Sequence, residues 1–300
     1  MIRMKQTAFG LLFVLFGSSS FAACPSLPNN LQNGQTADAT QVMANFNALL
    51  NCINSPLRGY LGGLTLSNDA TATKLDISAG EATSDDAATR MILGSAWVKS
   101  LGSTFTSGAG NGGLDTGAVA ASTWYHVFLI SDSTGLTTDI LFSTSLSPSM
   151  PSGFTKKRRI GSIRTNGSSQ IISFTQNGDL FLLANSVSGT WDQSNIATSS
   201  TGALVTLNVP PGVQVRALIF VASIITTASY SLQSTFQTTN PATGIWNFGL
   251  PAGSGQYPPG GQLEVLTNTI AQISVASNAN YANGFFLSTL GWTDTRGRFF

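Results

Sequence analysis

Charge is scarce in this sequence. Lys, Arg, Asp and Glu together make up 9% of the 300 residues, against roughly 25% in an ordinary soluble domain. The formal net charge is +1, so no overall field draws the protein to nucleic acid or to an anionic membrane. The polar surface must come mainly from Ser, Thr, Asn and Gln. That pattern is typical of extracellular and viral β-proteins, and also of any Thr-rich β-sandwich.

Residues that commonly carry chemistry are equally few. One histidine and two cysteines leave little for a structural zinc site. The sequence has no Gly-x-Ser-x-Gly elbow, no Walker loop and no His-Glu-x-x-His. A Ser-His-Asp triad would depend on His126, which stands in an apolar, β-rich run, so we expect a buried histidine with a hydrogen-bond partner instead. We predict no catalytic, cofactor-binding or metal-binding residues.

Glycoside hydrolysis would need two carboxylates facing each other across a cleft, roughly 5–9.5 Å apart. Glu81, Asp85 and Asp86 are close in the sequence, but a turn presents such residues without any catalytic role. The other carboxylates considered are scattered: Asp179, Asp192, Glu264 and Asp294. A glycan depolymerase is therefore the least favoured function.

The N-terminus has the layout of a secretory signal peptide. Arg3 and Lys5 precede an apolar run over residues 8–16, and small residues follow up to Ala23. The run is too short to span a bilayer as a helix. Residues 21–24 form a weak lipobox that would lipidate Cys24. The alternative is that residues 1–23 are never removed and anchor the chain between other subunits.

Residues 24–55 predict an N-terminal extension followed by one amphipathic helix over residues 38–54. Asp38 or Thr36 can cap the helix. An apolar stripe recurs at helical spacing, formed by Val42, Met43, Phe46, Leu49, Leu50 and Ile53. A single helix cannot bury this stripe alone, so it packs either on its own chain or on two further copies.

Cys24 and Cys52 flank this segment. In an oxidising compartment they would form a disulfide. Lipidation of Cys24 would leave Cys52 free, and both would start reduced in a virion assembled in the cytoplasm.

From Tyr60 onward the apolar pattern has the period of two that is typical of strands. Expected strands in residues 56–185 are 74–78, 123–130, 140–143, 159–163, 171–175 and 181–183. A Ser/Thr-rich passage suggests a boundary near Asn185. Expected strands in residues 186–300 are 203–209, 215–225, 229–236, 263–267, 271–276 and 284–292. We therefore predict a mostly β protein, with an N-terminal amphipathic helix followed by two antiparallel β-sandwich or jelly-roll-like domains.

Two features of the β region are candidates for binding. Lys156, Lys157, Arg158 and Arg159 form the one charge run. It indicates either an anion or nucleic-acid patch, or an edge strand that uses like charge against unwanted pairing, or a subunit contact; we favour the last two. The aromatic residues in or near loops of the last domain could contact a receptor, and they are Tyr230, Phe236, Trp246, Phe248 and Tyr257.

Several strings resemble a known family. Residues 31–39 (LQNGQTADA) and 42–47 (VMANFN) are similar to the N-terminal region of many phage and prophage tail proteins. Residues 111–115 (NGGLD), 123–130 (TWYHVFLI) and 157–163 (KRRIGSI) resemble a recurrent tail-fibre module. In that family a Phe-x-Gln-x-Gly-Asp segment typically follows, and residues 174–179 (FTQNGD) match it. The resemblance covers about residues 31–183.

The resemblance implies a non-enzymatic virion component on the tail, usually homotrimeric, that binds other phage tail proteins and a host polysaccharide or outer-membrane protein. Residues 186–300 would form its distal binding domain. The signal-like start departs from the family, because phage fibres assemble in the cytoplasm. It favours the alternative of an exported or lipid-anchored, prophage-encoded adhesin on the surface of a Gram-negative bacterium.

Overall fold

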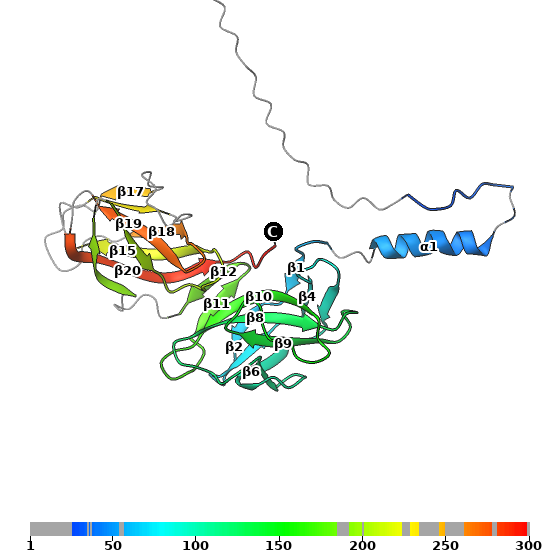
Figure 1. Cartoon of the computed structure of the whole chain (residues 1–300), viewed down its shortest axis with the longest axis horizontal. Coiled ribbons are helices and arrows are strands. Elements are labelled where there is room, and N and C mark those ends of the chain that lie inside the picture. Colours follow the sequence, from blue (N-terminus) through cyan, green and yellow to red (C-terminus); the bar gives the residue numbers. More distant parts are fainter. Residues whose placement is uncertain are drawn as a thin grey trace, which may run out of the picture. The chain divides into compact units, whose positions relative to one another are not determined.

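The computed structural model of the chain describes residues 26–34, 36, 38–53, 57–184, 192–199, 201–223, 229–233, 246–249, 261–277 and 281–298. The chain divides into two compact units, Met1–Ser55 and Pro56–Phe300. The described residues are mostly strand, with one short helix near the N-terminus (Figure 1). The mostly β prediction is therefore confirmed. The expected boundary between residues 185 and 186 lies outside the described residues.

The first unit contains helix α1 (Ala39–Ile53), one residue inside each end of the expected helix. Asp38 caps it as predicted, since its Oδ1 accepts from the Thr40 N–H at 2.8 Å. The preceding segment is attached to the helix through Asn45, whose amide exchanges two hydrogen bonds with the backbone of Asn29 at 3.0 and 2.8 Å. The helix contains no charged residue.

Two sheets begin the second unit. Within the described residues, β10, β8, β9, β7, β6, β3 and β2 form a seven-stranded sheet in that order, and β1, β4 and β5 form a small one. The pairs are antiparallel except for β6–β7 and β7–β9, which are parallel. The strands are β1 (Leu61–Gly63), β2 (Leu66–Asn68), β3 (Lys74–Ile77), β4 (Gly80–Thr83), β5 (Arg90–Leu93), β6 (Trp97–Thr104), β7 (Gly112–Leu114), β8 (Trp124–Ser131), β9 (Thr138–Ser143) and β10 (Lys156–Arg164).

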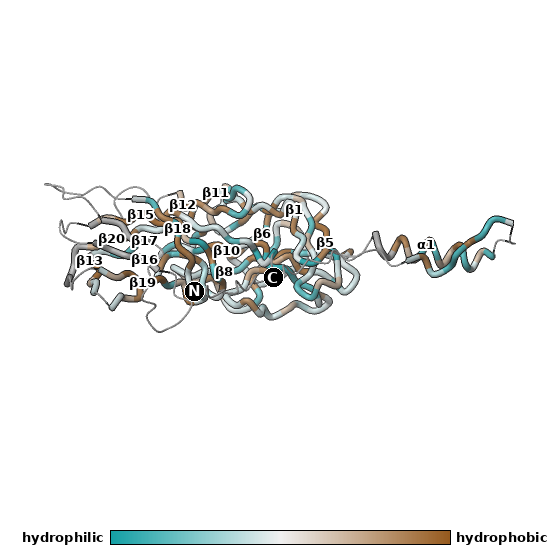
Figure 2. The backbone as a smooth tube through the Cα atoms, turned by 90° about the horizontal axis from the view of Figure 1, so that it is seen from above, coloured by the Kyte–Doolittle hydropathy of each residue, from teal (hydrophilic) through white to brown (hydrophobic). Residues whose placement is uncertain are grey.

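Two antiparallel sheets complete it. One has the order β11-β12-β20-β15-β18, with β13 also paired to β20, and the other has the order β14-β19-β16-β17. The strands are β11 (Phe174–Asn177), β12 (Leu180–Leu183), β13 (Gln193–Thr198), β14 (Ala203–Thr206), β15 (Arg216–Ser223), β16 (Ser229–Gln233), β17 (Trp246–Gly249), β18 (Gly261–Leu266), β19 (Gln272–Ser277) and β20 (Tyr281–Thr293). Apolar residues, brown in Figure 2, recur along these strands.

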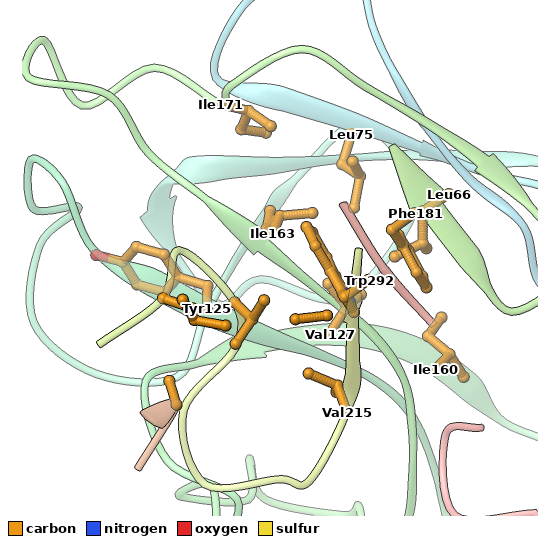
Figure 3. Packing of buried hydrophobic residues seen from close by; sticks show 14 of the residues in the cluster. Leu66, Leu75, Tyr125, Val127, Ile160, Ile163, Ile171, Phe181, Val215 and Trp292 are labelled. Carbon is orange, nitrogen blue, oxygen red and sulfur yellow. The ribbon is translucent and has the colours of Figure 1, made fainter. Parts of the chain in front are cut away.

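One hydrophobic cluster joins strands from both parts of this unit. Figure 3 shows Trp292 of β20 between Phe181 of β12 on one side and Val127 and Ile163 on the other. The rings of Phe181 and Trp292 stack at 5.2 Å between centroids, and Trp124 meets Trp292 edge-on at the same distance. Because these side chains are buried against each other, the seven-stranded sheet and the β20 sheet share one core.

The Gly-rich loop after β6 is organised around a buried ion pair. Lys99 Nζ lies 2.5 Å from Asp139 Oδ1, and both side chains have zero exposure. The ammonium also donates to the carbonyls of Thr106 and Gly108 at 2.9 and 3.0 Å, so its three protons all have acceptors. Burial lowers the Lys99 pKa, and Asp139 opposes this. The loop therefore wraps a structural ion pair.

Two Asn-Gly pairs lie in turns of this unit. In the β11–β12 turn, Gly178 has φ +61°, which glycine adopts without strain. At Asn166-Gly167 the turn is closed by a bridge from Thr165 to Ile171, but Ser169 has the positive φ, 59°. The Asn166 side chain explains this difference, because its Oδ1 accepts from two backbone N–H groups further along the turn.

Candidate functional site

The charge run of residues 156–159 opens strand β10, which lies at an edge of the seven-stranded sheet. This position agrees with the expectation of an edge strand. The side chains, however, do not form a row of exposed like charges. Lys156 and Lys157 pair with Asp86 and Asp85, each at 2.6 Å. Arg158 and Arg159 are buried, with 5% and 9% exposure.

The segment after β20 supplies the partners that bury these arginines. Asp294 accepts two hydrogen bonds from Arg159, at 2.6 and 2.8 Å, and one from the Arg296 N–H at 2.8 Å. Gly297 has φ +70° and lies against the Arg158 guanidinium. A Cβ at this position would be 3.7 Å from Arg158 Nη2. Residues 294–297 thus fold over the start of β10.

The turn between β11 and β12 joins the same cluster. Asp179 accepts from Arg296 at 3.0 Å and also pairs with Arg298. Burial lowers the pKa of Arg296, and Asp179 opposes this. Asp294 is buried, which raises its pKa, but the charge of Arg159 and hydrogen bonds outweigh burial and hold that pKa below its ordinary value. Two carboxylates therefore hold three of the four arginines.

His126 lies behind this cluster and is hydrogen-bonded, as the sequence predicts. Its Nδ1 is 2.9 Å from Ser162 Oγ, and that oxygen accepts from Arg159 at 3.2 Å. Burial, and then the Arg159 charge, lower the pKa of His126 to about 4. The imidazole is therefore neutral near pH 7, and its Nδ1 shares one hydrogen bond with the Ser162 hydroxyl. Asp294 binds Arg159 rather than the imidazole, and both His126 and Ser162 are buried, so this is not the geometry of a hydrolytic triad.

A pocket of about 370 Å³ opens beside these residues. Four cationic side chains and two carboxylates line it, together with an apolar wall. The charged lining residues are Lys157, Arg158, Arg159, Arg296, Asp85 and Asp294, and the apolar wall is formed by Phe128, Leu146 and Val213. Lys157 Nζ also lies over the Phe128 ring, 5.4 Å from its centroid. We call this space the arginine pocket.

Arg158 is the cation in this pocket whose charge is least matched. Asp85 approaches Arg158 Nη1 only to 3.9 Å, which is beyond hydrogen-bond distance. Arg158 Nη2 donates to the Gly59 carbonyl at 3.4 Å, and its Nε has no acceptor among the described residues. Burial lowers the Arg158 pKa, Asp85 opposes this, and Arg159, Arg296 and Arg298 lower it further.

Four other carboxylates considered in the sequence each have their own hydrogen-bond or ion-pair partner. Glu81 pairs with Arg90, and Asp192 accepts from the Thr289 N–H at 2.6 Å. Asp85 and Asp86 pair with the two lysines of β10. The described residues contain no group of three or more His, Cys, Asp or Glu side chains able to hold a metal ion.

The aromatic candidates lie in strands where the structure describes them. Tyr230 in β16 is the register partner of Phe248 in β17, and Leu232 is the partner of Trp246. Phe236, Tyr257 and Cys24 lie outside the described residues, as does the side chain of Cys52, so the receptor contacts and the disulfide stay predictions. Over the described part of the chain, no helix is long and apolar enough to cross a membrane. The apolar run of residues 8–16 is outside that part.

Sequence reasoning found one side of the arginine pocket and missed the other. Arg296 and Arg298 received no role, and Asp179 and Asp294 were considered only as scattered carboxylates. A charge run followed far along the chain by Asp-x-Arg-x-Arg (residues 294–298) was the available signal. No protein-family model matches the chain, and no curated protein matches it.

Proposed function

We propose that this protein is a structural, non-catalytic component of a bacteriophage tail, of the tail-fibre type, which mediates attachment to the host surface. The observation that carries the proposal is how the family-like strings lie in the fold. Residues 123–130 and 157–163 occupy β8 and β10, which pair directly with each other. Residues 111–115 contain β7, whose Leu114 pairs with Phe142 of β9.

The fourth string, residues 174–179, also contacts this part of the structure. Gln176 accepts a hydrogen bond from the Leu66 N–H at 2.7 Å, and Asp179 holds Arg296 and Arg298. Strings that are separated in the sequence thus form one packed piece. This contiguity supports their origin as one module.

We further propose that the β regions are sandwich-like. Residues of the β20 sheet, such as Ile219 and Phe285, and Val275 of the β14–β17 sheet belong to one buried cluster, as two packed sheets require. In this proposal the C-terminal part faces the host, and α1 joins sister chains or other tail proteins.

The signal-like N-terminus favours a second candidate, an exported or lipid-anchored surface adhesin of a Gram-negative bacterium. Intact mass with N-terminal peptide mapping, on purified phage particles, separates the two. A chain in the particles that begins at Met1 or Ile2 supports the tail component. Absence from particles, or a chain that begins near Cys24 in an outer-membrane or secreted fraction, overturns it in favour of the adhesin.

A further inference from the structure

We propose that the arginine pocket binds a small organic anion, a carboxylate or phosphate group carried on a molecule the size of a monosaccharide. This inference rests on the proposed function and deepens it, because acidic sugars are a class of host-surface receptor. The lining of the pocket has an excess of positive charge, because it contains four cationic side chains and two carboxylates.

The carboxylates are already engaged. Asp294 is held by Arg159 through both oxygens, and Asp85 pairs with Lys157 at 2.6 Å. Asp179, next to the pocket, is shared by Arg296 and Arg298. No carboxylate among the described residues lies within hydrogen-bond distance of Arg158, whose side chain is 7% exposed. A charged group that is buried to this extent is costly without a counter-charge.

The arginines of the pocket also have hydrogen-bond donors without acceptors. The Nε of Arg158, and both the Nε and the Nη1 of Arg296, have no acceptor among the described residues. Buried polar atoms are normally hydrogen-bonded. Because Arg158 and Arg296 line the same pocket, their spare donors indicate a site for an acceptor that the described residues do not supply. Arginine is suited to this role because its planar fork binds two oxygens of a carboxylate or phosphate.

The shape of the pocket favours an organic anion over a bare ion. Its volume of about 370 Å³ lies within the roughly 300–1,000 Å³ of small-molecule sites. Phe128, Leu146 and Val213 add apolar surface to its charged lining. A sugar ring can pack its C–H face on apolar lining residues while its acidic group pairs with the arginines of the lining.

The test uses the purified full-length chain at constant ionic strength, with D-glucuronate, glucose 6-phosphate and glucose as probes. Thermal unfolding and calorimetric titration are the readouts. We expect at least one of the two acids to bind and to raise Tm with concentration, and glucose to do neither. Which acid binds distinguishes a carboxylate from a phosphate. Absence of binding by both acids, or equal binding of glucose, overturns the proposal.

Three variants assign the binding to the pocket. Arg158→Met keeps the aliphatic stem and removes the charge, so binding should weaken by at least about tenfold. Gln214→Glu adds a negative charge at an exposed position of the lining. It should also weaken binding, and it keeps the test decisive if Arg158→Met fails to fold. Arg216→Met, at an exposed arginine of β15, is the matched control and should bind normally. Unchanged binding in both pocket variants would refute the site.

This result is separable from the proposed function. Binding is measured on pure protein, whereas the role in a tail is measured by the presence of the chain in particles. A chain found in particles that binds neither acid retains the tail assignment and loses the pocket ligand.

Discussion

Arg159 and Asp294 lie 135 residues apart in the sequence, and their side chains meet in two parallel hydrogen bonds, Nη1 to Oδ2 at 2.6 Å and Nη2 to Oδ1 at 2.8 Å. Asp294 is 2% exposed. The pair connects the start of β10 to the residue that follows β20. Both residues line the arginine pocket.

Breaking this pair should cost far more than breaking an exposed pair on the same strand. Asp294→Asn leaves the Arg159 charge buried without a counter-charge, and we expect a loss of about 3–5 kcal/mol in the free energy of unfolding. Lys156→Gln removes the exposed pair with Asp86 and should cost less than about 1 kcal/mol. Denaturant unfolding measures both. Equal losses in the two variants would contradict the structural role assigned to Asp294.

The Lys99–Asp139 pair should behave as a coupled unit. Lys99→Met leaves the Asp139 carboxylate with the hydroxyl of Ser107 and the N–H groups of Gly108 and Ile140 as donors, but without its counter-charge. We expect each of Lys99→Met and Asp139→Asn to cost about 3–5 kcal/mol. The double variant should lose clearly less than the sum of the two, because the second change removes the stranded group. Additive losses in a denaturant double-mutant cycle would count against the coupling.

Stability should fall on mild acidification because of His126. Its pKa is about 4 in the folded protein, against an ordinary 6.5. The folded state therefore binds this proton less readily than the unfolded state, so the stabilisation is complete above pH 6.5 and is lost as the pH falls towards 4. The loss attributable to this group is roughly 3 kcal/mol. Denaturant unfolding at pH 7 and pH 4.5 measures it.

The matched variant is His126→Asn, whose side-chain amide can replace Nδ1 as the hydrogen-bond partner of Ser162. It should flatten the pH dependence within this window. Lys156 and Ser84 lower the pKa of Asp86 from 3.8 to about 2. The stabilisation from Asp86 is therefore lost mainly below pH 3.8, outside this window. A pH dependence that is unchanged in His126→Asn would rule out the histidine as its source.

Several strands could be predicted from local patterns in the sequence. The alternation over residues 74–78 and the apolar run of 123–130 predicted β3 and β8, because both depend only on neighbouring side chains. Short strands such as β1, β2 and β7 went unpredicted, since three residues give too little periodicity. The charge run of β10 was visible in the sequence, but its pairing with residues 294–298 was not, because Arg159 and Asp294 meet only through tertiary packing.

Close backbone contact at Gly291 should make that position intolerant of any side chain. Gly291 pairs with Leu182 of β12 and with Leu218 of β15, and a Cβ there would overlap the carbonyl oxygen of Phe181. Gly291→Ala must push β12 away from β20, so we expect a loss of about 1–3 kcal/mol. Gly94→Ala is the control, because its Cβ would meet nothing within 4 Å. Thermal unfolding that ranks the two variants equally would contradict this packing.

The apolar side of α1 should drive self-association of the chain. Four large side chains on this helix are exposed within the unit: Met43, Phe46, Leu49 and Leu50, at 55%, 57%, 42% and 54%. An uncharged helix with such a stripe is expected to be covered by copies of itself. Phe46→Glu places a charge within the stripe and should convert an oligomer, which we propose to be a trimer, into a monomer.

Gln41→Glu adds the same charge on the opposite side of the helix, as its spacing from Phe46 dictates, and should leave the oligomer intact. Light scattering on the full-length chain measures both variants against the unchanged protein. If the unchanged protein is already a monomer, α1 does not associate with itself. The proposal of a trimeric tail component then loses its N-terminal support.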